Sequence, residues 1–242
     1  NYICGGCGQC ASLCPTGAVT YAVPGPAVDF ERLRILLSRY LAAGGTAPML
    51  LVYDHAGEEI LSAIGRFGRG LPANVLPYSI NEVTAAGLDL LLLAAAYGAE
   101  ATLILCPRRQ TDALGGLQSQ IEIAETILKG MSVGVGRPFI LDEVDPDIIE
   151  TKLFEIAASR TKGLAFEAAK FLPLGGKRDR MWLALDHLQK NAVGAPSPIA
   201  LPTGAPFGAV SVNLEGCTLC LACVSACPTG ALLDNPERPQ LS

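Results

Sequence analysis

The middle of the chain alternates short apolar runs with longer segments in which apolar residues recur at helical spacing. The runs of strand length are residues 49–53, 74–78, 101–106 and 139–141. The segments with helical periodicity are residues 58–67, 82–97, 117–131 and 146–159. Strands without a polar face that alternate with helices are typical of a parallel sheet covered on both sides. The pattern therefore predicts an α/β domain.

Other elements flank this region. The pattern predicts a helix from Phe30 to Ala43, with Asp29 as its N-cap and two glycines after it. A second helix is expected over residues 175–191, followed by an extended, proline-spaced linker over residues 195–206 that carries the chain back across the domain. Residues 18–23 and 208–212 have strand character.

Eight of the nine cysteines lie in two copies of one motif near the ends of the chain. The cysteines of the first copy are Cys4, Cys7, Cys10 and Cys14, and those of the second are Cys217, Cys220, Cys223 and Cys227. Each copy has the spacing C-x2-C-x2-C-x3-C-P, and both continue Pro-Thr-Gly-Ala. The chain therefore contains an internal repeat that is divided by a long insertion.

The spacing suits a [4Fe–4S] cluster, because each iron of the cube takes one thiolate and three closely spaced cysteines can surround one cube. Backbone N–H groups between the cysteines can face the sulfurs, and Gly5, Gly6 and Gly8 permit a close approach. Disulfides would require an oxidising compartment and would not explain two identical copies. Structural zinc sites use pairs of cysteines rather than this spacing. The motif favours iron–sulfur binding over both alternatives.

The two copies resemble the halves of a bacterial two-cluster ferredoxin. In such ferredoxins the cysteine before the proline ligates the other cluster. The resemblance implies one cluster held by Cys4, Cys7, Cys10 and Cys227, and a second held by Cys217, Cys220, Cys223 and Cys14.

The hydrophobic pattern and this resemblance together give the predicted fold class. We expect a flavodoxin-like or Rossmann-like parallel-sheet α/β domain that is inserted between two halves of a ferredoxin-like α+β iron–sulfur lobe. The expected domains are a first half-lobe at 1–28, the α/β domain at 29–171, a helix and return linker at 172–206, and a second half-lobe at 207–242. The last residues, 235–242, read as a turn and strand that lead toward a further cysteine run beyond Ser242.

Composition and charge exclude several classes of partner. The 242 residues are 50% apolar and 17% charged, with a net charge of −5, which argues against nucleic-acid binding. The most apolar stretch, Leu88–Ala96, is too short to span a bilayer and contains Asp89, so no membrane insertion is expected. Cysteines committed to cluster motifs indicate a reducing, cytoplasmic location.

Residues 47–158 also resemble the iron–sulfur delta subunit of methyl-viologen-reducing hydrogenases, which occurs fused to heterodisulfide reductase components. The resemblance rests on Pro72-Ala-Asn-Val75, Gly98-Ala-Glu100 and Leu105-Cys106. That family binds a [2Fe–2S] cluster through cysteines at the strand ends. This chain has Tyr53-Asp-His55 at the first strand end and Ser79-Ile-Asn81 at the second, which leaves Cys106 alone. We therefore expect no [2Fe–2S] cluster in the α/β domain.

The remaining candidates at the strand ends carry weaker signals. Cys106 reads as a buried small residue, although Arg108 and Arg109 follow it. His55 beside Asp54 could act in acid–base chemistry, but a capped helix start or a surface histidine is the favoured interpretation. The sequence suggests no role for His187, which lies on a charged helix face. The stretch Gly65–Gly70 reads as a helix end and a solvated loop rather than a dinucleotide-binding fingerprint.

The sequence thus favours an electron-transfer iron–sulfur protein, or a piece of a larger oxidoreductase component, that carries two [4Fe–4S] clusters and contacts redox protein partners or subunits. We expect no catalytic residues in this chain. The first alternative is a ligand-binding crevice in the α/β domain to which the clusters supply electrons. The second is an α/β domain that serves to dock a catalytic partner.

Overall fold

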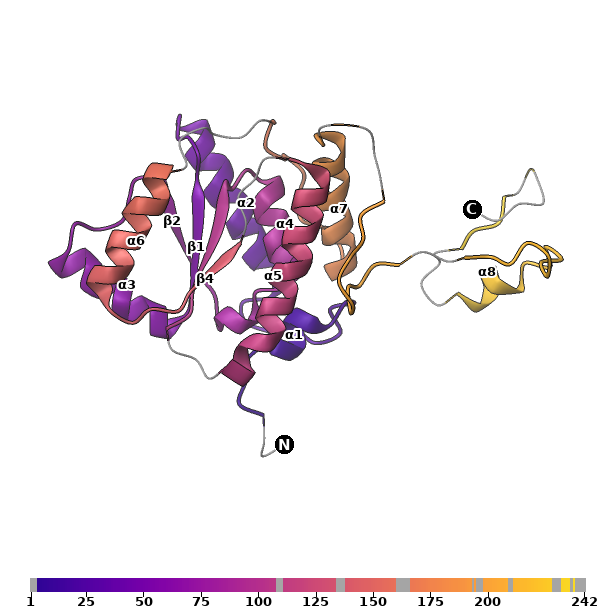
Figure 1. The fold of residues 1–242 in the computed structure, drawn as a ribbon, viewed down its shortest axis with the longest axis horizontal. Helices are drawn as coiled ribbons and strands as arrows, with labels where there is room; N and C mark the ends of the chain where they lie inside the picture. Colours follow the sequence, from indigo (N-terminus) through magenta and orange to yellow (C-terminus); the bar gives the residue numbers. More distant parts are fainter. Residues whose placement is uncertain are drawn as a thin grey trace. The chain divides into compact units, whose positions relative to one another are not determined.

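A computed structural model describes residues 4–107, 111–133, 138–159, 166–192, 194, 198–208, 211–227, 232–235 and 237. The chain forms two compact units, residues 1–205 and residues 206–242. The first unit contains the α/β domain and the first cysteine run, and the second unit contains the second cysteine run (Figure 1).

The first unit is built on a four-stranded sheet. Its strands are β1 (Met49–Tyr53), β2 (Val75–Ser79), β3 (Ala101–Leu105) and β4 (Phe139–Leu141). They are all parallel and lie in the order β2-β1-β3-β4, so that Met49 pairs with both Val75 and Ala101. The prediction of a parallel α/β sheet is confirmed, with β1 as predicted and the other boundaries within one residue.

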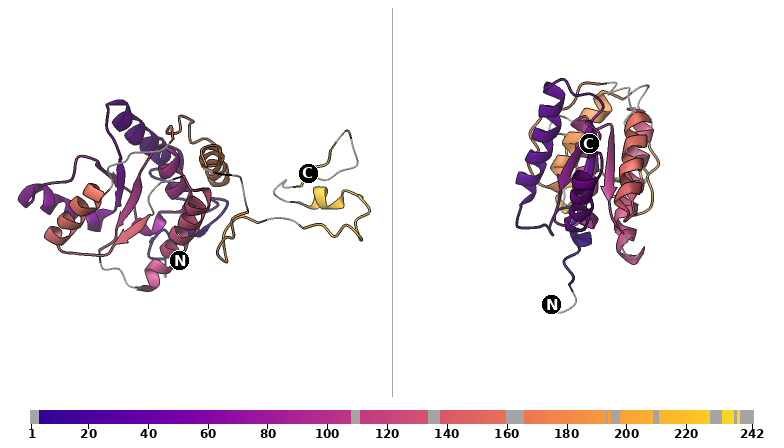
Figure 2. Two further views of the ribbon diagram at one scale, coloured as in Figure 1. Left: turned by 45° about the horizontal axis from the view of Figure 1, so that its top comes forward. Right: turned by 90° about the vertical axis from the view of Figure 1, so that its left-hand side faces the viewer.

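Helices cover both faces of the sheet. They are α2 (Pro26–Ala42), α3 (His55–Phe67), α4 (Leu88–Ala96), α5 (Thr111–Met131), α6 (Pro146–Ser159) and α7 (Lys177–Lys190). Figure 1 and Figure 2 show α3 and α6 on one face and α2, α4, α5 and α7 on the other. The strand side chains explain this division, because residues at alternate positions point to opposite faces. Met49, Leu51 and Leu103 pack with apolar residues of α3 and α6.

Helix α4 lies at the centre of the second layer. Every one of its residues is buried, and α2, α5 and α7 all contact it, which explains why all of its residues except Asp89 are apolar. Burial of a leucine side chain stabilises the fold by about 1.5–3 kcal/mol, so α4 is a major anchor for this layer. Among the described helices, none is long and apolar enough to cross a membrane.

The prediction of one continuous helix over residues 82–97 is wrong. The segment forms a short 3-10 turn, η1 (Val83–Ala85), and then the separate helix α4. The break has two causes. The backbone N–H of Leu88, the first residue of α4, donates to Gln120 Oε1 instead of a helical carbonyl. Gly87 is extended, and a side chain there would lie 2.9 Å from Asp89 Oδ1.

Helix α2 begins at Pro26, four residues before the predicted start at Phe30. Proline suits the first turn of a helix, because its φ is already helical and its missing N–H has no partner there. Gly25 is therefore the N-cap, and Asp29, which was predicted as the cap, lies within the first turn.

Two predicted strands are not strands. Residues 18–23 form bends, and the Tyr21 hydroxyl in this segment donates to Gly6 O at 2.6 Å. Of the segment 208–212, residues 209 and 210 lie outside the described residues, and residues 208, 211 and 212 are not in a strand. The C-terminal prediction at 235–242 also falls mostly outside the described residues. The turn at its start is seen, since Asn235 Oδ1 accepts from Glu237 N.

Candidate metal centre

The first cysteine run folds as a loop followed by a short helix, α1 (Gln9–Leu13). Gly6 and Gly8 have left-handed backbones, with φ of 67° and 81°, and Gly8 is the N-cap of α1. Cys14 ends the helix in an extended conformation. Cys4, Cys7 and Cys10 are exposed and Cys14 is half-buried.

The second cysteine run has the same local backbone. Leu219 and Leu221, which correspond to Gly6 and Gly8, have φ of 53° and 59°. Leu221 is the N-cap of a short helix, α8 (Ala222–Ala226), and Cys227 ends it in an extended conformation. A left-handed backbone costs a residue with a side chain about 1–2 kcal/mol, so two leucines in this conformation indicate that the loop shape itself is required.

This loop shape suits an anionic sulfur ligand. Alternation of right- and left-handed residues turns successive backbone N–H groups toward one point, which forms an anion-binding concavity. The Cys14 thiolate accepts hydrogen bonds from the Thr16 hydroxyl and from backbone N–H groups of Val19 and Thr16, and these lower its pKa to about 6. In the second run, hydrogen bonds from the Ala222 backbone and the Thr218 hydroxyl lower the pKa of Cys220.

Among the described residues, no three His, Cys, Asp or Glu side chains converge on a common point. The fit to a cluster therefore rests on the donor set of four cysteines in each run and on the backbone of the loops. Thiolate donors are the ligands that iron–sulfur clusters use. The hydrogen bonds to Cys14 and Cys220 favour the charged form that such a ligand needs.

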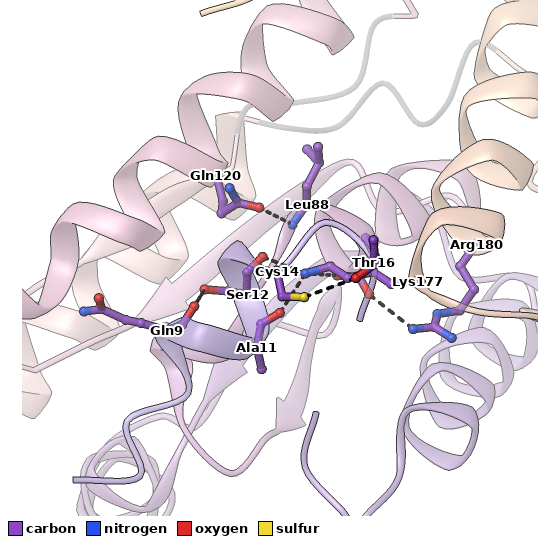
Figure 3. A network of polar contacts seen from close by, with 10 residues as sticks. Gln9, Ala11, Ser12, Cys14, Thr16, Leu88, Gln120, Lys177 and Arg180 are labelled. Atoms are coloured by element: carbon purple, nitrogen blue, oxygen red, sulfur yellow. Dashed lines mark hydrogen bonds and ion pairs between the residues drawn. The ribbon is translucent and has the colours of Figure 1, made fainter. Parts of the chain in front are cut away.

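The first run lies against the α/β domain. The hydroxyl of Thr84 in η1 donates a hydrogen bond to the backbone carbonyl of Cys7. Gly8 is so close to η1 that a Cβ on it would lie 2.6 Å from the Cβ of Ala85. Helix α1 also contacts α5, and Leu13 lies beside Gly116. Figure 3 shows α1 in this position, with its last carbonyls facing the start of α7.

Asp54 connects the sheet to this loop. It follows β1 and is only 2% exposed. Its Oδ1 accepts from Ala56 N and Gly57 N, which caps α3, and its Oδ2 accepts from Val83 N at 3.1 Å. The carboxyl end of β1 therefore holds η1, and η1 holds the first cysteine run. Ligands of open parallel sheets bind at this edge.

The other strand-end residues lie around a shallow pocket of about 360 Å³. The pocket is lined by Pro24, Arg32, Tyr53, Asp54, His55, Glu58, Ser79, Ile80 and Asn81. The pocket thus brings together residues from the ends of β1 and β2. His55 is the first residue of α3 and its side chain is 87% exposed, which confirms its interpretation as part of a capped helix start.

The remaining predicted candidates have structural surroundings. Cys106 is buried, and its backbone N–H donates to Leu141 O, as expected of a small residue at a strand end. His187 contacts Phe166 and Phe171, and its Nε2 lies 3.0 Å from Glu167 O. Within Gly65–Gly70, Arg69 forms an ion pair with Glu150 of α6, so this stretch is not simply a solvated loop. Arg108 and Arg109 lie outside the described residues.

We expect Asp54→Ala to lower the free energy of unfolding by about 2–4 kcal/mol, because it removes a helix cap and leaves the buried N–H of Val83 without its acceptor. Urea unfolding of the iron-free protein measures the change. His55→Ala at the neighbouring, exposed position serves as the control and should change the value by less than about 0.5 kcal/mol. Equal effects of the two substitutions would mean that Asp54 does not hold η1.

Comparison with known proteins identifies one matching domain family. The family model of the 4Fe-4S binding domain matches residues 210–233, which include the second cysteine run. No curated protein and no solved structure matches the chain. The match and the motif support a ferredoxin-type iron–sulfur protein with a binding domain for a [4Fe–4S] cluster. In this chain the domain accompanies a four-stranded parallel α/β unit.

Proposed function

We propose that the protein is an electron-transfer component of an oxidoreductase complex and that it carries two [4Fe–4S] clusters. The observation that supports a second cluster is the shared backbone of the two runs. Both have left-handed residues directly before and after the second cysteine, a short helix over the third, and an extended fourth cysteine. The family match covers the second run, and the first run repeats its spacing and local shape.

In this proposal Cys4, Cys7 and Cys10 hold one cluster together with Cys227. Cys217, Cys220, Cys223 and Cys14 hold the other. When bound, each cluster supplies one-electron transfer. The chain itself supplies thiolates, directs N–H groups toward them, and sets how far each sulfur is exposed. The ferredoxin-like lobe would thus be formed by the two cysteine runs, which precede and follow the α/β domain in the sequence.

The α/β domain is then a support and docking domain rather than a catalytic crevice. Asp54 and Thr84, at the edge where ligands of such sheets bind, are engaged in holding η1 and the first run. The exposed cysteines of that run leave it accessible to a redox partner protein. We propose electron-donor and electron-acceptor proteins or subunits as partners, with no nucleic acid, no membrane insertion and a cytoplasmic location.

Anaerobic reconstitution tests the proposal. The protein should contain about eight irons and eight acid-labile sulfides per chain, and its visible absorption should bleach on reduction. Cys106→Ala is the control, since Cys106 lies buried at the end of β3 and should not affect the iron content. A colourless protein that takes up zinc and no iron would refute the proposed function, and half of the expected iron would refute the second cluster.

A further inference from the structure

Lys177 joins the start of α7 to the first cysteine run, although the two are far apart in the sequence. Its side chain is only 6% exposed, and its Nζ donates to Ala11 O at 2.8 Å and to Ser12 O at 2.6 Å. Both acceptors are carbonyls in the last turn of α1, where a positive charge is favoured (Figure 3). The Lys177 side chain also fills the space beside Gly17, where a Cβ would approach it to 3.0 Å.

The surroundings of Lys177 are charged. Asp89 Oδ1 lies 3.9 Å from its Nζ, and Arg180 Nη2 lies 3.5 Å from the other oxygen of Asp89. The Arg180 guanidinium also donates to Gly175 O and lies over the ring of Phe30. The ammonium group of Lys177 therefore makes two hydrogen bonds to α1 and one longer ion pair to Asp89.

The charges do not cancel within this group. Two buried cations, Lys177 and Arg180, face one buried carboxylate, Asp89. The group therefore carries a net positive charge beneath α1. Burial lowers the pKa of Lys177, and the negative charges of Asp89 and of the Cys14 thiolate oppose this shift.

We propose that Lys177 is a positioning residue that fixes the first cysteine run on α7 and that its charge raises the reduction potential of the cluster bound through Cys14. The second part rests on the proposed function. The reductant supplies one electron, which makes the bound cluster more negative by one charge. A nearby fixed cation stabilises the reduced form more than the oxidised form, so it favours reduction.

The first test uses the iron-free protein and hydrogen–deuterium exchange. Lys177→Met should increase exchange of the backbone amides at residues 9–14 by about tenfold or more, while β1 and β3 keep the wild-type rate. Asp89 keeps Arg180 as a partner in this variant, so we expect the fold to persist. Lys190→Met, which removes an exposed lysine from the other end of α7, should leave residues 9–14 unchanged.

The second test is a dithionite titration of the reconstituted protein followed by electron paramagnetic resonance. Lys177→Met should make reduction of one cluster about tenfold less favourable, a fall of about 59 mV in its midpoint potential. Lys177→Arg, which keeps the charge, should retain most of the wild-type potential.

The outcomes separate the two parts. Unchanged exchange at residues 9–14 would overturn the positioning role, and unchanged potentials in an iron-loaded Lys177→Met would overturn the charge effect. A fall of the same size in Lys177→Arg would also overturn the charge effect. If the wild type binds no iron, the proposed function fails and the charge effect fails with it, whereas the exchange comparison still decides the positioning role.

Discussion

Serine at Cys4, Cys7, Cys10 and Cys14 should leave a chain that binds no cluster, whereas serine at Cys4, Cys7, Cys10 and Cys227 should leave a chain that binds one. Both variants lose three ligands of the first cluster. They differ in the fourth position, because Cys14 is proposed to ligate the second cluster and Cys227 the first. Serine is nearly isosteric with cysteine but is a much poorer ligand for iron, so the loss should be nearly complete.

Iron and acid-labile sulfide content after anaerobic reconstitution measures this difference, together with the resonance of the reduced cluster. The triple variant with serine at Cys4, Cys7 and Cys10 is the reference, and it should hold one cluster. If each run instead completes its own cluster, the two fourfold variants exchange their results. Retention of the cluster in both would show that its fourth ligand comes from elsewhere, which would also contradict the proposed pairing.

The structure gives a physical reason why the α/β domain and the first cysteine run belong together. An open parallel sheet presents N–H groups and helix starts at its carboxyl edge, and that edge commonly binds a ligand. Here Asp54 at the end of β1 uses both carboxylate oxygens to hold α3 and η1. Thr84 of η1 then binds the carbonyl of Cys7. The edge thus supports the first cysteine run of the same chain.

The sheet could be predicted from the sequence because its signals are local. A strand such as Met49–Tyr53 is an uninterrupted apolar run, and each of its residues is buried or nearly so. The helices after the strands show apolar periodicity, and Asp54 precedes α3 as a cap residue should. These features depend on neighbours in sequence, so they can be read without knowing the fold.

The elements that hold the first run could not be predicted, because they depend on contacts between distant segments. The helix pattern over 82–97 is continuous, and the break after η1 involves a hydrogen bond from Leu88 N to Gln120 Oε1, 32 residues later. Lys177 gives no sequence signal of its own, since its partners are backbone carbonyls 165 and 166 positions away. The start of α2 at Pro26 was readable in principle, from a proline that follows a glycine.

The cysteine spacing predicts candidate ligands but not the shape of the loops. Nothing in the sequence marks Leu219 and Leu221 as left-handed, because leucine rarely adopts that backbone. The cysteine spacing aligns them with Gly6 and Gly8, but only the structure shows that all four residues share a left-handed backbone. This shared backbone shows that the loop itself tolerates side chains at both positions, so glycine at Gly8 has another cause.

That cause is the close contact of Gly8 with Ala85 of η1. Gly8→Ala should displace the first run from the α/β domain, because the new Cβ would lie 2.6 Å from Ala85 Cβ, 2.9 Å from the Tyr21 hydroxyl oxygen and 3.2 Å from Ala85 Cα. Overpacking of this kind costs about 1–3 kcal/mol, in addition to about 1–2 kcal/mol for a left-handed alanine. We expect urea unfolding of the iron-free protein to show a loss of about 2–5 kcal/mol, and reconstitution to yield less of the first cluster.

Gly6→Ala is a closely matched control. Gly6 is also left-handed, but a Cβ there would meet nothing within 4 Å, so the variant carries the backbone cost without the contact. It should lose only about 1–2 kcal/mol and keep its iron. Adding Ala85→Gly to Gly8→Ala removes the opposing methyl group and should recover much of the difference between the two variants, since residues in contact are energetically coupled. If Gly8→Ala proves no more harmful than Gly6→Ala, or if Ala85→Gly restores nothing, then η1 does not seat the cysteine loop, and the α/β edge has no part in forming the metal centre.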